Sequence, residues 1–296
     1  MGWWADRFIN IPKALLPSVL DNVADFGKTD PAFFGHEIPI TGVAGDQHAA
    51  LIGQACFKEG MVKSTYGTGC FVVMNTGNQV VQSKVSLLST VAYRIKGKIA
   101  YGLEGSIFNA GTVVQWLRDK VHLIKNAGDT EAICRNTSST KNIYLVPAFT
   151  GLGAPYWDSQ ARGAILGLTR DSTDHEIVRA GLESIAYQTK DLIDAMISDG
   201  ASHLAALRVD GGMVANNWFL GFLADILQIN IQRPACIETT ALGAAYLAGL
   251  GAGLYADLEE IQRHWQLSQE FLPQMAKEEV GMLYQGWKKA VKSVLS

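Results

Sequence analysis

A single carboxylate lies where a short β-type run, residues 38–41, gives way to the first turns of a helix. Asp46 follows two closely spaced glycines, and Gln47 comes directly after it. Open α/β folds place ligand-binding groups at such strand ends, and a carboxylate within reach of a hydroxyl can accept its proton. Asp46 could also be a simple helix cap, because side-chain oxygens at a helix start accept backbone N–H bonds. The residue types at this point leave both interpretations open.

Two β-rich runs, residues 61–66 and 70–75, are joined by the tight turn Gly67-Thr68-Gly69, and this pattern predicts a β-hairpin. Neither neighbour of Thr68 has a side chain, so the backbone N–H groups and the Thr68 hydroxyl are exposed at the tip. Such a tip can hold a phosphate group. It can equally be an ordinary hairpin turn, whose glycines supply positive φ angles.

A second glycine turn, Asp210-Gly211-Gly212, separates a predicted strand at 205–209 from a predicted helix at 216–227. The N-terminal end of that helix points at the turn and favours anions or polar groups there. A second strand and a second helix follow, at residues 229–233 and 241–250. This order is typical of α/β nucleotide-binding proteins, although the chain contains neither a P-loop nor a G-x-G-x-x-G fingerprint.

The elements that position these motifs include three further predicted helices, of which one, at residues 13–20, is opened by Pro12, and a second, at residues 107–118, carries a helical apolar stripe. Gly111 lies inside the second of these and weakens it by ~1 kcal/mol relative to alanine, which a close approach of ligand or backbone would explain. Thr173 and Glu176 form a T-x-x-E capping box, which predicts the start of a long helix.

The composition excludes several classes of protein. With 48% hydrophobic and 18% charged residues and a net charge of -3 over 296 residues, the chain is typical of a folded protein rather than a disordered one. It has no clustered Lys/Arg face, so no nucleic-acid partner is expected. No apolar run long enough to span a membrane and no secretory signal occur, so we expect no membrane insertion and a cytoplasmic location. The four cysteines form no CxxC pair and are expected to be buried free thiols: Cys56, Cys70, Cys134 and Cys236.

Taken together, these motifs resemble the FGGY family of carbohydrate kinases, most closely its glycerol-phosphorylating members. The resemblance rests on five segments in family order, at residues 42–47, 65–71, 109–117, 151–157 and 210–217. It extends over nearly the whole chain but covers only the C-terminal part of the family, whose members are roughly twice as long.

The resemblance implies an α/β fold of the actin/hexokinase-like, ribonuclease H-like ATPase type. Residues 1–55 would be the end of the family's first domain, and residues 56–296 the complete second, ATP-binding domain. It also implies ATP and Mg²⁺ as cofactors, glycerol as the phosphoryl acceptor and sn-glycerol 3-phosphate as the product. A homodimer or homotetramer is implied for the full-length protein.

The same resemblance assigns roles to individual residues. Asp46 would be the general base and a glycerol ligand, with Gln47 beside it and Phe71 packed on the carbon skeleton of glycerol. Thr68, with Gly67 and Gly69, would contact the ATP phosphates. The adenosine slot would be lined by Gly111, Gln115, Gly211, Gly212 and Asn216.

Some family features have no counterpart in this sequence. The family's N-terminal region carries a first phosphate-binding hairpin, a metal-ligating Asp, and an Arg-Glu pair plus a Tyr that hold glycerol. No metal ligand is therefore assigned here, and we expect that the 296-residue chain does not turn over glycerol alone. Glu37 stands where some bacterial members carry an arginine used for inhibition by fructose 1,6-bisphosphate. A carboxylate would repel that phosphate, so this regulation is not expected.

Two alternative functions stay open on the sequence. The chain could belong to another FGGY sugar kinase, of the xylulose or gluconate type, or it could be a non-catalytic nucleotide-binding module with an actin-like fold. Phe71 and the loop at residues 151–157 favour glycerol, because a small triol needs a small and partly apolar slot. His48 is interpreted as a packed residue, since the neighbouring Asp46 already fills the role of base.

Overall fold

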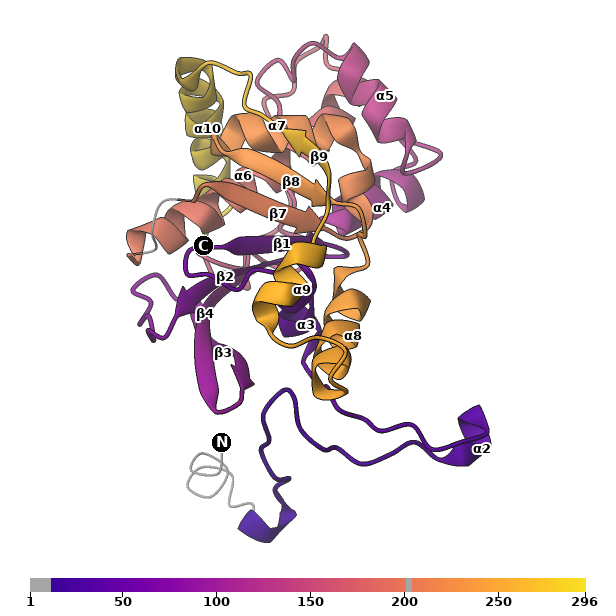
Figure 1. The fold of residues 1–296 in the computed structure, drawn as a ribbon. Helices are drawn as coiled ribbons and strands as arrows, with labels where there is room; N and C mark the ends of the chain where they lie inside the picture. The colour runs from indigo at the N-terminus through magenta and orange to yellow at the C-terminus, as the bar shows by residue number, and fades with distance from the viewer. Residues whose placement is uncertain (1–11, 201–203) are drawn as a thin grey trace.

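A seven-stranded mixed sheet organises the part of the chain that the structure, a computed structural model, describes, which is residues 12–200 and 204–296. The strand order is β3-β4-β2-β1-β7-β8-β9, and Figure 1 shows the strands stacked through the centre of the molecule. The strands are β1 Val62–Tyr66, β2 Cys70–Gly77, β3 Leu88–Ile95, β4 Lys98–Ile107, β7 Ala206–Asp210, β8 Asn230–Pro234 and β9 Leu267–Phe271. A separate two-stranded sheet pairs β5 Tyr144–Val146 with β6 Ala164–Leu166.

The sheet changes from antiparallel to parallel at β1. Strands β1, β2, β4 and β3 form antiparallel neighbours, whereas β1 pairs with β7, and β7 with β8, in parallel. In this register Thr65 lies opposite Asp210. Parallel strands end at the same edge of a sheet, so the hairpin turn at 67–69 and the glycine turn at 211–212 become neighbours. The predicted α/β class and the predicted hairpin are confirmed.

Helices cover both faces of the sheet. Their bounds are α2 Pro31–Phe34, α3 Asp46–Gly53, α4 Gly111–Asp119, α5 Asp129–Asn136, α6 Asp174–Ser198, α7 Asn217–Leu227, α8 Thr239–Gly251, α9 Leu258–His264 and α10 Lys277–Lys292, with 3₁₀ turns η1 Lys13–Leu15 and η2 Gly212–Ala215. One apolar core lies between the sheet and helices α4, α6, α7 and α10, and a smaller one lies under α3, α8 and α9.

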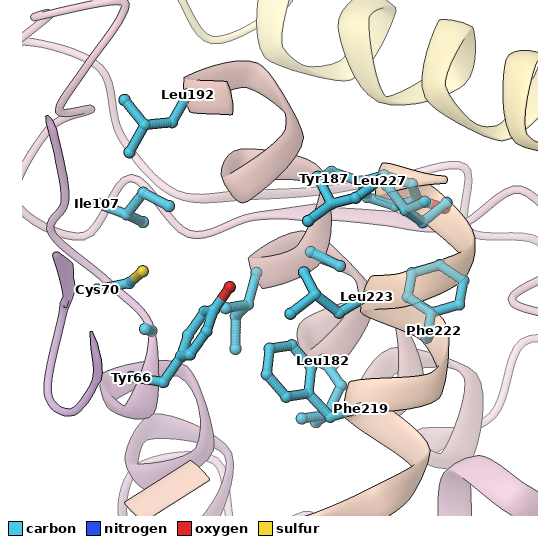
Figure 2. Packing of buried hydrophobic residues seen from close by; sticks show 14 of the residues in the cluster. Tyr66, Cys70, Ile107, Leu182, Tyr187, Leu192, Phe219, Phe222, Leu223 and Leu227 are labelled. Atoms are coloured by element: carbon cyan, nitrogen blue, oxygen red, sulfur yellow. The ribbon is translucent and has the colours of Figure 1, made fainter. Parts of the chain in front are cut away.

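Aromatic side chains fill the larger core. Figure 2 shows Tyr66 and Cys70 of the hairpin facing Leu182 of α6 and Phe219 of α7. The Tyr66 and Phe219 rings meet edge to face with their centroids 5.2 Å apart, an arrangement that adds to the stabilisation from burial. This packing fixes the hairpin against α7, and with it the spacing of the two glycine turns.

The long helix α6 begins where its capping signal predicts. The Thr173 N–H donates to Glu176 Oε2 at 2.8 Å, and the reciprocal bond of the capping box is also present. Lys141 adds an ion pair to Glu176 at 2.7 Å. These contacts satisfy backbone donors that an uncapped helix start would leave free.

Helices α3 and α8 cross with their backbones in direct contact. A Cβ atom added to Gly243 would lie 1.8 Å from the Ala49 carbonyl oxygen, and one added to Gly53 would lie 2.0 Å from the Thr239 oxygen. Only glycine at positions 53 and 243 permits this close approach of α3 and α8. The contact fixes α3, and hence Asp46 at its start, to the body of the fold.

Several predicted elements are wrong in detail. Residues 13–20 contain only the short turn η1, and residues 38–41 contribute a single isolated bridge, at Pro39, rather than a strand. The helix predicted at 107–118 begins at Gly111, because β4 continues to Ile107. Cys56, Cys70 and Cys134 are buried as expected, and burial raises the pKa of each thiol to about 12, but Cys236 is exposed.

The segment from residue 12 to residue 44 forms an extended arm (Figure 1), which contacts the body of the fold through Asp21 and Asn22 at Arg94 and through Thr41 at α8. Large apolar side chains are exposed along it, namely Leu15, Val19, Leu20, Phe33, Phe34, Ile38, Ile40 and Val43. Phe33 is 79% exposed. A patch of this kind on a folded protein usually marks a surface that another segment or protein covers.

Candidate functional site

A cavity of about 420 Å³ opens at the edge of the sheet where the two glycine turns meet. Six of the eight residues that the sequence assigns to nucleotide binding line it: Gly67, Thr68, Gly111, Gln115, Gly212 and Asn216. They come from the hairpin turn, from α4, and from the turn and cap that precede α7. Segments more than 100 residues apart in the chain are thus brought to one place. Their role in binding a nucleotide stays a prediction.

The hairpin tip is held by the start of α4. The Thr68 carbonyl oxygen accepts hydrogen bonds from the N–H groups of Ala110 and Thr112, each at 3.1 Å, and the Gly111 N–H donates to the Gly67 oxygen at 2.9 Å. The Thr68 side chain is exposed and faces the cavity. The tip is therefore rigid in its backbone and free in its hydroxyl, which suits a phosphate contact.

The close approach of backbone expected at Gly111 is present, although the residue lies at the start of its helix and not inside it. Gly111 opens α4 rather than interrupting it, and a Cβ there would lie 2.5 Å from the Gly67 carbonyl oxygen. Gly69 and Gly211 do not line the cavity, so the structure does not bring them together with the other six. A Cβ on Gly69 would meet the Ile107 oxygen at 2.6 Å, and one on Gly211, whose φ is +90°, would meet the Tyr66 oxygen at 2.5 Å. These two glycines let strands and turns approach.

Asn216 joins two walls of the cavity. Its Oδ1 accepts the Phe219 N–H at 2.9 Å as the N-cap of α7, and its Nδ2 donates to Thr130 Oγ1 at 3.2 Å. Thr130 and its neighbour Glu131 lie on α5, and both line the cavity. Sequence reasoning missed these α5 residues. A lone glycine, Gly128, directly precedes α5 and also lines the cavity, but it belongs to no recognised motif, so the tertiary contact with α7 is what reveals them.

Asp46 is the first residue of α3, and its side chain is exposed. The N-cap position belongs to Gly45, so the interpretation of Asp46 as a simple N-cap is not supported. Asp46 Oδ1 accepts the N–H of Gln47 at 2.7 Å, and its Oδ2 lies 3.5 Å from Gln47 Nε2. The carboxylate is thus held from one side and open to solvent on the other, as a proton acceptor for an incoming hydroxyl needs to be.

A buried lysine, which the sequence reasoning missed, lies behind Gln47 and Phe71. Lys63 on β1 is fully buried, and its Nζ donates to Gln47 Oε1, to Thr65 Oγ1 at 2.9 Å and to the Phe71 carbonyl oxygen at 3.4 Å. Burial lowers the pKa of Lys63, and the charge of Asp210 opposes that shift. A charged residue in the otherwise uncharged β-rich run 61–66 was the available signal.

Asp210, at the end of β7, is also buried. Burial raises its pKa, whereas the charge of Lys63 and the hydrogen bond from Gln54 lower it. Gln54 Nε2 donates to Asp210 Oδ2 at 2.8 Å. The residue that begins the second glycine turn thus anchors that turn to α3 rather than facing a ligand.

His48 lies on α3 and packs against the sheet. Its Nε2 is 3.2 Å from Thr90 Oγ1, and burial lowers the pKa of the imidazole. This agrees with the interpretation of His48 as a packed residue. Within residues 12–200 and 204–296, no three Asp, Glu, His or Cys side chains gather to form a metal site. In the same described part of the chain, no helix is long and apolar enough to cross a bilayer.

The chain is similar to curated glycerol kinases over almost its whole length. It is 57% identical over 296 residues to the glycerol kinase of Coxiella burnetii (strain RSA 331 / Henzerling II), which covers 99% of this chain and 59% of that protein. It is 60% identical over 290 residues to the glycerol kinase of Ectopseudomonas mendocina (strain ymp), covering 98% and 59%. The chain therefore spans about three fifths of the length of these relatives.

Solved structures give the same relationship. The crystal structure of Plasmodium falciparum glycerol kinase with ADP matches with a TM-score of 0.90 and 38% identity, over 99% of this chain and 59% of that one. The gluconate kinase of Lactobacillus acidophilus matches with a TM-score of 0.84 at 23% identity, over 99% and 60%, which shows the fold alone. These likenesses confirm the predicted actin/hexokinase-like ATPase fold.

The FGGY family of carbohydrate kinases, C-terminal domain, matches residues 62–252. That range contains the hairpin turn, the start of α4 and the glycine turn before α7, which together line the cavity. The sequence motifs, the fold and the relatives all lead to the same assignment. The chain belongs to the FGGY family of carbohydrate kinases.

Proposed function

We propose that this chain supplies the nucleotide site and the general base of an ATP-dependent kinase that phosphorylates glycerol to sn-glycerol 3-phosphate. The observation that carries the proposal is the convergence of six predicted nucleotide-binding residues on one cavity. The identity of 57–60% to glycerol kinases supports glycerol as the acceptor. The ADP in the Plasmodium falciparum glycerol kinase structure supports an adenine nucleotide as the other ligand.

The chain's own residues divide the reaction between two sides. On the nucleotide side, the adenosine enters the slot between α4 and α7, and the Thr68 hydroxyl and the hairpin tip contact the phosphates. On the acceptor side, Asp46 accepts the proton of the attacking hydroxyl, while Gln47 and Phe71 contact the glycerol. Phosphoryl transfer requires this combination of positioning, phosphate contacts and an oxygen base.

Mg²⁺ enters the proposal only together with the nucleotide. In kinases the ion is held by phosphate oxygens and one or two carboxylates, and it neutralises charge on the phosphates. The described residues offer the exposed carboxylate of Asp46 but no cluster of three acidic, His or Cys side chains. We infer that no residue of this chain holds the ion alone.

The proposed domain organisation places residues 1–55 at the end of a first domain and residues 56–296 in a second, although residues 1–11 lie outside the described residues. The exposed apolar arm supports this division, because it lies before the segment that matches the family's C-terminal domain. We infer that the other wall of the acceptor site comes from the part of the relatives' length that this chain does not span. The completed enzyme is expected to be a cytoplasmic homodimer or homotetramer.

The proposal can be tested by joining this chain to the part of a relative that it does not span. The chain would be fused behind the N-terminal part of the Coxiella burnetii glycerol kinase that it does not match, and ATP consumption would be measured with glycerol, xylulose and gluconate. We expect glycerol-dependent turnover by the fusion and none by the 296-residue chain alone. A folded fusion that binds ATP but prefers xylulose or gluconate, or phosphorylates nothing, would contradict the proposal.

A further inference from the structure

The buried lysine on β1 contacts two of the three residues predicted to bind the phosphoryl acceptor. Its Nζ donates to the Gln47 side chain and to the Phe71 carbonyl, and Gln47 in turn lies beside Asp46. From this arrangement we propose that Lys63 is a positioning residue, which fixes the orientation of the Gln47 amide and the β2 backbone around the acceptor hydroxyl. The inference rests on the proposed function for the identity of the acceptor.

The hydrogen-bond inventory of Lys63 is complete. An ammonium group has three N–H donors and no acceptor, and Lys63 has three acceptors: Gln47 Oε1, Thr65 Oγ1 and the Phe71 oxygen. A fully buried charge is costly unless it is paired and hydrogen-bonded. Losing any of the three hydrogen bonds would leave a buried N–H donor of Lys63 unpaired, and this free-energy cost keeps the three acceptors in place.

The contact from Lys63 decides which way the Gln47 amide points. Because Oε1 accepts from the ammonium, Nε2 must project on the opposite side, where it lies 3.5 Å from Asp46 Oδ2. An amide N–H in that position can donate to the oxygen of the acceptor hydroxyl while the carboxylate takes its proton. Without the ammonium, the amide could rotate by half a turn and present an acceptor instead.

The counter-charge of Lys63 comes from the nucleotide side. The charge that attracts it most strongly is Asp210, whose neighbouring turn contributes Gly212 to the cavity wall. Gln54 holds Asp210 and itself accepts a hydrogen bond from Trp265 Nε1 at 3.1 Å. One buried polar network thus lies beneath both sides of the proposed site.

The direct test needs no kinase activity. The side-chain amide resonances of Gln47 would be compared by NMR in the 296-residue chain and in its Lys63→Met variant. We expect two well-separated Nε2 proton signals in the natural chain, which collapse toward the values of a free amide in the variant. Unchanged Gln47 signals in a folded Lys63→Met variant would overturn the inference.

Lys288→Met is the control, because Lys288 is a lysine whose Nζ contacts a buried group, the Asp191 carboxylate at 3.3 Å, but which lies outside the proposed site. It should leave the Gln47 signals unchanged. If Lys63→Met does not fold, the double variant Lys63→Met/Asp210→Asn is used in its place. It removes both buried charges, and removing both is tolerated better than leaving one of them uncompensated. The same collapse of the Gln47 signals is then expected.

A kinetic comparison in the fusion protein distinguishes positioning from a merely structural role. Lys63→Met should lower kcat/KM for glycerol by about tenfold or more, while KM for ATP changes by less than about twofold. Unchanged kcat/KM for glycerol would contradict the inference. If the unmodified fusion does not phosphorylate glycerol, the proposed function fails, whereas the NMR comparison still decides whether Lys63 orients Gln47.

Discussion

The two sides of the proposed site differ in how much of their structure this chain contains. The nucleotide side is enclosed by the hairpin turn, α4, α5 and the start of α7, and its walls are tied together by hydrogen bonds such as that from Asn216 to Thr130. The acceptor side consists of one exposed carboxylate at the start of α3 and the neighbouring Gln47, whose Oε1 accepts a hydrogen bond from Lys63. Next to it extends an arm of exposed apolar side chains.

From this difference we predict that binding a nucleotide and transferring its phosphate are separable in this chain. The packed core between the sheet and α7 fixes the nucleotide side without further help. On the acceptor side, the proposed base Asp46 is exposed and has no opposing wall within the described residues. A substitution on one side should therefore leave the other side's binding intact.

The largest expected effect comes from Asp46→Asn, which removes the proton acceptor but keeps the size of the side chain. In the fusion protein kcat should fall by about 10²- to 10⁴-fold, the range typical of losing a general base. The ADP affinity of the 296-residue chain should stay the same, as measured by calorimetry. A loss of ADP affinity in this variant would show that the two sides are not independent.

The next effect concerns the attachment of α3 to the body. Gly243→Ala would place a Cβ 1.8 Å from the Ala49 oxygen, and forced overpacking of this kind costs about 1–3 kcal/mol or more. Thermal unfolding should show the loss. Gly281→Ala on α10 is the control, because a Cβ there meets nothing within 4 Å and should be neutral or stabilising. Equal melting temperatures for the two variants would contradict the close packing of α3 on α8.

A smaller effect is expected on the nucleotide side from Gly111→Ala. The added Cβ would push the hairpin tip away from α4, since it would lie 2.5 Å from the Gly67 oxygen. ADP affinity should fall by about tenfold, or 1.4 kcal/mol. Gly221→Ala on α7, where a Cβ meets nothing within 4 Å, should bind ADP like the natural chain. Full affinity in Gly111→Ala would mean that the tip is not part of the binding site.

The smallest effect lies away from both sides, at the start of α6. The ion pair with Lys141 and the hydrogen bond from Thr173 lower the pKa of Glu176 from 4.5 to about 2. A lowered folded-state pKa stabilises the fold above the unfolded value, and this stabilisation is lost as the pH falls from 4.5 toward about 2. Glu176→Gln should lower Tm at pH 7 by about 2–4 °C.

The difference in Tm between Glu176→Gln and the natural chain should shrink as the pH approaches about 2. ADP affinity at neutral pH should be unchanged, because none of the three residues of this capping contact, Lys141, Thr173 and Glu176, lines the cavity. A Tm difference that is independent of pH would show that the carboxylate charge does not contribute.

Much of the fold could be predicted from local signals. The hairpin, the capping box at Thr173 and the strand–turn–helix unit around Asp210 each depend on residues close together in the chain, and the structure places all three as expected. The predicted start of α4 is wrong because β4 continues to Ile107, and the helix begins where Gly111 meets the Gly67 backbone, 44 residues away. Sequence periodicity carries no information about such a contact.

Prediction of the candidate site from the sequence is limited in the same way, by contacts between residues far apart in the chain. Motif residues such as Thr68 and Gly212 could be assigned to the nucleotide side from the family resemblance, and they line one cavity. Thr130, Glu131 and Lys63 could not, since the first two come from a helix without a motif and the third is buried in a strand. Their positions follow from tertiary packing and from the pairing of β1 with β7.

The most direct test of the account is calorimetric titration of the 296-residue chain with ADP and, separately, with glycerol. The account predicts one-to-one binding of ADP with a Kd between about 1 μM and 1 mM, lost or weakened in Gly111→Ala and retained in Asp46→Asn, together with no detectable binding of glycerol. A folded chain that binds glycerol but not ADP would contradict the claim that the nucleotide side is complete and the acceptor side is not.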